Sequence, residues 1–396
     1  MTLVVDNRDR LRGRPGLHAL IAGVSHYRHL PEGHGETGTD TYGLKQLSTA
    51  ATSAFRIYQW LKRRSDHLIA PLSTARLLLS PADEEDEIDE SVTPCTWDNF
   101  VEAAHEWRAD ASVNKDDVTF FYFAGHGIIR DKADSVLICD DFAQPRRGAL
   151  PNVVAFPNIF WGMAPPADTT QPRARRQFYF IDACREFPKE LKDFEKLEIQ
   201  SVFKSELSGT DDRVAPIFQA AISGSEAYAS AVEQTLFSIA LLDCLNGLAG
   251  EAGPENNDGS IPWRVPVFKL STILDERIEA LNERYKTDQK SGLVGMPKDI
   301  PIHYLDGPPT VEGTLTVVPE DAKRLINIDV LNSRQSSVWQ PTLEQAYPYQ
   351  GRLTAGSYFV KSTIREPPKP PYSNRISEPK PVTPPNFILK ARPADD

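Results

Sequence analysis

Apolar residues follow two different periodicities along the first three quarters of the chain. Continuous apolar runs at 17–24, at 176–184 and directly before Gly125 are rich in β-branched and aromatic residues, and each is long enough for one buried strand. Apolar positions within 44–64 and 97–108 recur every three or four residues, which is the spacing of an amphipathic helix. The same periodicities predict further strands at 75–80, 135–141, 214–223 and 301–306, and further helices at 233–248 and 268–285. Buried strands that alternate with amphipathic helices are typical of an α/β fold around a mainly parallel sheet.

The pattern changes after residue 306. Short segments of alternating apolar residues follow, separated by turns, and they predict a small all-β, sandwich-like domain over 307–365. The last segment, 366–396, is rich in proline, which predicts an extended or partly ordered tail. We therefore expect an N-terminal extension at 1–16, an α/β domain at 17–306, the small β domain and the tail.

Composition and charge exclude several classes of protein. The formal net charge is −11, whereas a nucleic-acid binder needs clustered Lys and Arg to contact phosphates. No apolar run is long enough to span a bilayer and the N-terminus lacks a signal-peptide core, so we expect a cytoplasmic protein without membrane contact. The acidic run 83–90 predicts a solvated loop. The four cysteines are too widely spaced for a disulfide framework, and His26, His29 and His34 match no usual zinc pattern, so no metal site is expected.

Two chemically capable residues directly follow buried strands. His126 stands between two glycines after the run that ends at Gly125, and Cys184 ends the run at 176–184. Active sites of parallel sheets lie at the carboxyl ends of the strands, so these side chains could face one another. A thiolate is a nucleophile, and an imidazole can take up its proton and later protonate a leaving amine. The N–H groups of Gly127 and Cys184 would then form an oxyanion hole. The alternative is that both side chains are structural.

These two motifs together resemble the caspase and metacaspase superfamily. The cysteine lies in the sequence DACRE, which is similar to the caspase pattern Q-A-C-R-G, and His126 lies in AGHG upstream of it. The similarity extends from about Leu17 to Leu305. It implies a caspase-like α/β/α sandwich with a mainly parallel central sheet. It also implies a cysteine endopeptidase that uses His126 and Cys184 as a catalytic dyad, acts on proteins or peptides and needs no cofactor.

Asp182 departs from the caspase pattern, which has glutamine at this position. Metacaspases and other relatives specific for basic residues carry an aspartate there, facing the pocket for the residue before the scissile bond, so the resemblance implies cleavage after Arg or Lys. A carboxylate in that pocket would pair with a guanidinium or ammonium group and repel an acidic residue. The second acid of the metacaspase pocket is replaced by Ser53, and Asp40 is the candidate for supplying it from elsewhere. The opposite preference stays open, because Arg28 and Arg185 would suit an acidic substrate residue.

The segment from Glu186 to Arg213 is polar, charged and without a clear apolar period. In the superfamily, the segment after the catalytic cysteine is often cleaved or rearranged during activation. The resemblance therefore implies a zymogen, with Lys204 and Arg213 as candidate cleavage sites for an upstream activating protease. The alternative is a surface helix and loop.

The resemblance leaves the cofactor and the biological role as alternatives. Some metacaspases need calcium, and Asp140, Asp141 or the acidic run 83–90 could bind it, although no EF-hand loop is present. Prokaryotic caspase-like proteases are often effectors in stress or antiviral signalling. A second class of function is a catalytically idle caspase-like scaffold that binds partners through its C-terminal β domain. A thiol-reactive activity probe would separate this scaffold from an active peptidase.

Overall fold

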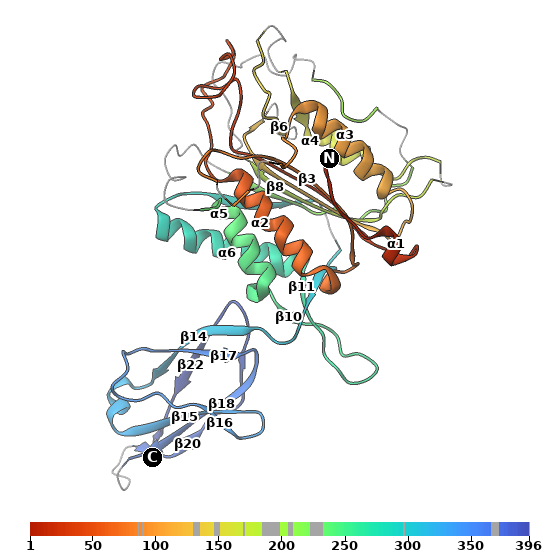
Figure 1. Ribbon diagram of the computed structural model, residues 1–396. Coiled ribbons are helices and arrows are strands. Elements are labelled where there is room, and N and C mark those ends of the chain that lie inside the picture. Colours follow the sequence, from red (N-terminus) through yellow and green to blue (C-terminus); the bar gives the residue numbers. More distant parts are fainter. Residues whose placement is uncertain are drawn as a thin grey trace. The chain divides into compact units, whose positions relative to one another are not determined.

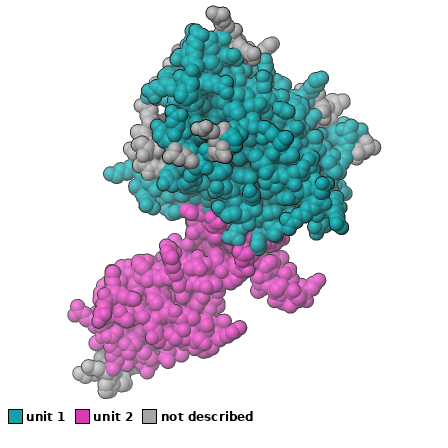
Figure 2. Space-filling view, in the orientation of Figure 1, with its two compact units in different colours: residues 1–242, 274–302 teal, residues 243–273, 303–396 magenta. Residues whose placement is uncertain are grey.

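The computed structural model divides the chain into two compact units (Figure 2). One unit comprises residues 1–242 and 274–302, and the other comprises residues 243–273 and 303–396. The residues that the structure describes are 1–85, 87–88, 91–129, 135–145, 151–168, 171–183, 199–204, 209–221, 233–295, 298–365 and 372–395.

A seven-stranded sheet forms the centre of the first unit. Its strands, in spatial order, are β1 (Leu3–Asp6), β3 (Leu72–Ser80), β2 (Leu17–Val24), β4 (Val118–Gly125), β8 (Arg176–Ala183), β9 (Ile217–Ala221) and β12 (Lys290–Val294). The strands from β3 to β9 are parallel to their neighbours, and the two edge strands are antiparallel. The prediction of a mainly parallel central sheet is therefore confirmed.

Helices cover both faces of this sheet (Figure 1). On one face lie α2 (Ala50–Arg63), α5 (Leu236–Asp243) and the later part of α6 (Val267–Tyr285), and on the other lie α3 (Trp97–Asp110) and α4 (Phe156–Gly162). The central strands are buried along their whole length, which explains their unbroken apolar runs. Thr96 caps α3 by accepting a hydrogen bond from the Asn99 N–H at 3.3 Å. These layers form the expected α/β/α sandwich.

A small antiparallel sheet follows the end of β4. It contains β5 (Gly127–Ile129), β6 (Ser135–Ile138) and β7 (Val153–Ala155). Its apolar side chains, which include Ile128, Leu137 and Val154, belong to the same core as Phe121 and Tyr179 of the central sheet. The backbone at His126 is therefore anchored to this core by β4 before it and by β5 after it.

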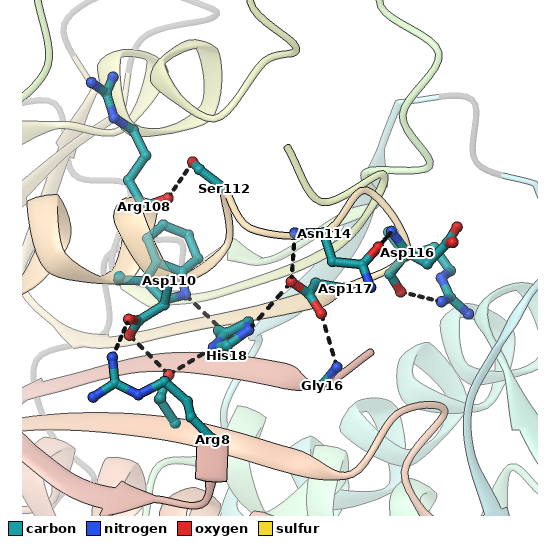
Figure 3. A network of polar contacts seen from close by, with 12 residues as sticks. Arg8, Gly16, His18, Arg108, Asp110, Ser112, Asn114, Asp116 and Asp117 are labelled. Atoms are coloured by element: carbon teal, nitrogen blue, oxygen red, sulfur yellow. Dashed lines mark hydrogen bonds and ion pairs between the residues drawn. The ribbon is translucent and has the colours of Figure 1, made fainter. Parts of the chain in front are cut away.

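A buried polar network holds the opposite, N-terminal ends of the strands (Figure 3). The His18 imidazole lies 2.8 Å from the Thr74 hydroxyl and 3.6 Å from the Asp117 carboxylate. Asp117 also accepts the Gly16 N–H at 2.9 Å, and Thr74 donates to Asp110 at 3.1 Å. Because these contacts join β2, β3, α3 and the start of β4, they fix the strand register at this end.

The expected N-terminal extension is part of the fold. Residues Leu3–Asp6 form β1 at the edge of the central sheet, and Arg8–Leu11 form the short helix α1. This corrects the expected boundary at residue 16. Only one face of β1 is partly covered, so its sequence has no long apolar run to announce a strand.

The second unit contains a β-sandwich with its own core. One sheet has the order β17 (Tyr349–Thr354), β14 (Thr310–Val317) and β22 (Asn386–Ala391). The other contains β16 (Ser337–Trp339), β15 (Ile326–Asn332), β18 (Gly356–Ile364), β20 (Arg375–Ile376) and β21 (Lys380–Val382). Shorter pairings join β10 (Glu251–Ala252), β11 (Trp263–Pro266) and β13 (Pro301–Leu305), and join β19 (Tyr372–Ser373) to β23 (Ala394–Asp395).

The proline-rich segment continues this sandwich beyond the expected boundary at residue 365. Strand β22 pairs in parallel with β14, and its side chains alternate between exposed and buried. Val382, Phe387 and Leu389 enter the β-sandwich core together with Leu315. The predicted tail, 366–396, is therefore corrected over its described residues, 372–395. Prolines next to or within short edge strands, such as Pro381 in β21, do not prevent alternate residues from being buried.

Candidate active site

His126 directly follows β4, at the carboxyl edge of the central sheet. Gly125 and Ala183 are paired at the ends of the adjacent parallel strands β4 and β8, so the two strands end side by side. Gly125 has a φ of +155°, and a Cβ atom there would lie 2.9 Å from the Tyr27 hydroxyl, so this turn requires glycine. Cys184 is the next residue in the sequence after Ala183 and lies outside the described residues.

The orientation of the His126 ring follows from one hydrogen bond. Its Nε2 lies 2.6 Å from the backbone oxygen of Lys45. A carbonyl oxygen can only accept, so Nε2 carries the proton and Nδ1 of the neutral ring is bare. Nδ1 is buried and has no hydrogen-bond partner among the described residues. The free lone pair is the one that a general base needs.

Burial keeps this imidazole neutral. His126 is only 6% exposed. Burial lowers the pKa of His126 from 6.5 to about 4, against the smaller opposing effect of the bond to the Lys45 carbonyl. The ring is therefore unprotonated at neutral pH.

Tyr27 and Gln46 support the histidine from behind. The Tyr27 hydroxyl accepts the His126 backbone N–H at 2.7 Å, and the two rings lie 4.9 Å apart. The Gln46 side chain accepts the Tyr27 N–H at 2.6 Å and donates to the Tyr27 carbonyl at 2.8 Å. Because Gln46 directly follows Lys45, one stretch of chain fixes both the ring and the backbone of His126.

Gly127, the predicted oxyanion donor, begins β5 and faces Leu137 of β6. The Ile138 N–H donates to the His126 carbonyl at 3.1 Å. This bond makes Gly127 and Leu137 a non-hydrogen-bonded pair of an antiparallel ladder, in which the Gly127 N–H points away from β6. The amide is thus not used in this ladder, as an oxyanion donor requires.

Asp182, the penultimate residue of β8, has a buried carboxylate that accepts hydrogen bonds from two hydroxyl groups. Tyr122 of β4 donates to its Oδ2 at 2.7 Å, and the Thr235 hydroxyl donates to the same oxygen. The side chain is 4% exposed. Burial raises the pKa of Asp182 from 3.8 to about 6, and the Thr235 and Tyr122 hydrogen bonds act in the opposite direction. The carboxylate is therefore ionised at pH 7 and protonated in mild acid.

The predicted pocket residues Ser53 and Asp182 are joined through Thr235. The Ser53 hydroxyl, on α2, accepts the Thr235 N–H at 2.8 Å. Asp40 is exposed and accepts a hydrogen bond from its neighbour Thr39 at 3.2 Å, and no contact among the described residues links it to Asp182. Thr235 was not among the predicted site residues, although a threonine directly before the apolar run LFSIALL is a typical N-cap signal.

The two candidate cleavage residues have different surroundings. Lys204 is exposed. It follows Phe203, which is fully buried, and the side-chain amide of Asn158 bonds both the N–H and the carbonyl of Phe203 at 2.8 and 2.9 Å. The Arg213 side chain is only 1% exposed, pairs with Asp211 at 2.8 Å and lies 4.5 Å over the Phe160 ring. A protease could reach Lys204 more readily than Arg213.

The acidic residues proposed for calcium already bind protein groups. Asp140 accepts from the Ser80 hydroxyl at 2.7 Å, and Asp141 accepts from the Trp97 N–H and the Asn152 amide, each at 2.9 Å. Across the described ranges no group of three or more His, Cys, Asp or Glu is arranged to hold a metal. Calcium prefers six to eight oxygen ligands, more than these two carboxylates supply by themselves, and calcium binding stays a prediction.

The acidic run 83–90 was predicted to be a solvated loop, but part of it is buried or paired. Glu85 is buried and accepts the Thr52 N–H and the Ala82 N–H, each at 2.7 Å, while Glu87 pairs with Arg56 at 2.8 Å. Thr52 lies in the first turn of α2, where helix N–H groups lack partners. The carboxylate of Glu85 therefore stabilises the start of this helix.

Comparison with known proteins identifies the family. The family model of the caspase domain matches residues 17–258, which include His126 and Asp182. The chain belongs to the caspase-domain family. The resemblance inferred from the two motifs is thereby confirmed, and the caspase domain makes this chain a member of a family of cysteine peptidases, whose substrates are proteins.

Two relatives extend this comparison. An uncharacterized protein of Sinorhizobium fredii is 28% identical over 261 residues, which are 63% of this chain and 71% of that protein. A probable protease of a Desulfuromonadales bacterium is 32% identical over 149 residues, which are 36% of this chain and only 17% of that protein. In the described part of this caspase-domain protein, no helix has the length and apolar character needed to cross a membrane.

Proposed function

We propose that the protein is a cysteine endopeptidase in which His126 and Cys184 form the catalytic dyad. The observation that carries this proposal is the bare, buried Nδ1 of His126 at the end of β4, beside the strand end that directly precedes Cys184. A neutral imidazole held through its other nitrogen is the arrangement that a general base needs.

The reaction follows from these groups. Nδ1 of His126 takes the proton of the Cys184 thiol, and the thiolate attacks the scissile carbonyl carbon. The N–H groups of Gly127 and Cys184 stabilise the oxyanion, and His126 then protonates the leaving amine as the C–N bond breaks. Water attacks the resulting thioester with His126 again accepting a proton, which releases the acid product and restores the thiol.

We infer that the substrate residue before the cut is Arg or Lys. Both hydroxyl donors to Asp182 go to Oδ2, and no hydrogen bond to Oδ1 is found among the described residues. An oriented carboxylate with one oxygen left over suits a guanidinium or ammonium group. Arg28, which would suit an acidic residue instead, is exposed, and Arg185 lies outside the described residues.

Fluorogenic peptides that end in Arg, Lys or Asp test both parts of the proposal. We expect the wild type to cleave the Arg and Lys peptides, and Cys184→Ala to cleave none. Cleavage of the Asp peptide alone would contradict the basic specificity. Equal activity of wild type and Cys184→Ala would contradict the dyad. Repeating the assay with EDTA tests the calcium prediction, since a calcium-dependent enzyme would lose activity.

We propose further that the chain is a zymogen activated by cleavage within the segment 186–213. Lys204, whose side chain is exposed, is favoured there over Arg213, whose side chain is buried. If peptides are cut only after a protease has nicked this segment, activation by an upstream protease is supported. A role as an effector in stress or antiviral signalling would then rest on finding that protease.

An idle scaffold is the second candidate function. The β-sandwich with its separate core favours it, because such a domain could bind partners without any catalysis. A thiol-reactive probe that labels Cys184 no faster than a free cysteine would favour the scaffold over the peptidase.

A further inference from the structure

We propose that Thr235 is the positioning residue that sets the direction and the ionisation of Asp182, and that it thereby determines the pH range in which a basic substrate residue is accepted. The inference rests on the proposed function, because it assigns Asp182 to the substrate pocket. It adds a residue that no motif indicates.

The direction of the Thr235 hydroxyl proton is fixed by its neighbours. Thr235 precedes α5, and its Oγ1 accepts the Ser238 N–H at 3.2 Å, as an N-cap side chain does. A hydroxyl has only one proton to donate. Oγ1 therefore donates that proton to Oδ2 of Asp182, with which it forms a short contact.

The backbone of Thr235 is held independently of Asp182. Its N–H donates to the Ser53 hydroxyl at 2.8 Å, and that hydroxyl donates its own proton to the Thr49 carbonyl at 2.7 Å. Ser53 is fully buried on α2. The backbone of Thr235 is thus anchored to α2 at the start of α5, and these two helices lie on the same face of the sheet (Figure 1). This anchor holds the Thr235 hydroxyl in position.

Among the described residues, only two hydroxyl groups offset the burial of Asp182. The described elements that face it bring Tyr122 from β4 and Thr235 before α5, and no charged side chain among the described residues contributes to its shift. Burial raises the pKa of Asp182 to about 6, and the two hydroxyls are what keeps it from rising further. Removal of one of these hydroxyls should therefore raise the pKa of Asp182 further.

This arrangement predicts the sign of a pH effect. An ionised Asp182 attracts a basic residue, and the protonated acid does not. The value of kcat/KM for an Arg peptide should therefore rise as pH increases through about 6. Without the Thr235 hydroxyl, Asp182 loses its proton only at higher pH, so the same rise should move upward.

Two variants of Thr235 test the proposal. Thr235→Val keeps the shape and removes the hydroxyl, and Thr235→Ser keeps the hydroxyl. For Thr235→Val we expect the midpoint of the rise to move up by about one pH unit, since hydrogen bonds to charged groups are worth roughly that much. At pH 6 and below, kcat/KM for the Arg peptide should fall by up to about tenfold. Thr235→Ser should restore the wild-type profile.

Two further readouts separate this inference from its foundation. The rate at which iodoacetamide alkylates Cys184 should be equal in wild type and Thr235→Val; a parallel loss would mean that Thr235 acts on the dyad, which overturns the proposal. The carboxyl ¹³C titration of Asp182, assigned with Asp182→Asn in a Cys184→Ala background, needs no activity. An unchanged midpoint in Thr235→Val overturns the inference, whereas failure of the wild type to cleave Arg peptides overturns the proposed specificity instead.

Discussion

At the scale of single residues, the histidine depends on groups that are not conspicuous in the sequence. The Lys45 carbonyl determines which ring nitrogen of His126 carries the proton, and the Tyr27 hydroxyl takes its backbone N–H. Gln46 then holds Tyr27 in place. Catalytic competence of His126 should therefore be sensitive to changes that leave the dyad itself intact.

Tyr27→Phe tests this dependence. The variant removes the acceptor of the His126 N–H, and a buried N–H without a partner costs about 1–3 kcal/mol. We expect kcat to fall about tenfold or more with little change in KM, because a misplaced base slows the chemical step. Steady-state kinetics with an Arg peptide measure both constants.

Tyr349→Phe is the matched control for Tyr27→Phe. Tyr349 is also a buried tyrosine, but it lies on β17 in the β-sandwich. Its kinetic constants should equal those of the wild type. If Tyr27→Phe leaves kcat unchanged, whether or not KM rises, the positioning role of Tyr27 is contradicted.

The sequence predicted those site residues that carry their chemistry in a side chain after a strand. His126 was found in this way, whereas Asp182 lies inside β8 and was indicated by the resemblance to metacaspases. The structure places both at the carboxyl edge of the sheet. The Lys45 carbonyl could not be found, because every residue has a carbonyl and only the fold selects one. Thr235 had a cap signal, but its link to Asp182 crosses more than fifty residues, as their numbers show, and no local pattern contains it.

At the scale of elements, long buried strands and amphipathic helices were predicted and short edge strands were not. Strands β1 and β12 at the two edges of the sheet have alternating partial burial and contain only four and five residues. Helix α4 has only seven residues, and helical periodicity needs a longer window to be recognised. The central strands were easier to predict because both of their faces are buried.

The order of strands has a consequence for activation by cleavage. Strands β9 and β12 follow the segment 184–198 in the sequence, yet β9 pairs with β8 from before it. Phe203 is buried as well. The two pieces produced by a cut within this segment share one sheet and one core, so we expect them to stay together.

A recognition site for a sequence-specific protease, inserted between Glu190 and Leu191, tests this expectation. After complete cleavage, both pieces should elute together from a size-exclusion column at the volume of the uncut chain. They should separate only in denaturant, which serves as the control. Separation in native buffer would show that the shared sheet does not hold the pieces.

At the scale of the whole molecule, the β-sandwich has a hydrophobic core distinct from the core around Phe121 and Tyr179. The core of the β-sandwich draws its buried members from residues 311–391, and the core around Phe121 and Tyr179 draws none from that range. Damage to one core should therefore leave the other largely intact.

Leu315→Ala tests the independence of the cores. Leu315 is fully buried in the β-sandwich core, and such truncations typically cost about 2–5 kcal/mol. We expect calorimetry to show a lower unfolding temperature for the β-sandwich, while kcat and KM for an Arg peptide stay at wild-type values. The matched variant Leu20→Ala removes a buried leucine from β2 and should reduce activity. Loss of activity in Leu315→Ala would show that catalysis requires the intact sandwich.

The polar network around His18 (Figure 3) has a consequence for how the central sheet opens. His18 binds both Thr74 and Asp117 at the N-terminal ends of the strands, whereas the carboxyl ends run directly into the loops of the candidate active site. Opening of the backbone should accordingly cost more at the first end than at the second, which gives each strand a gradient of amide-exchange protection. The loops at the carboxyl ends could thus adjust to a substrate while the N-terminal ends of the same strands remain closed.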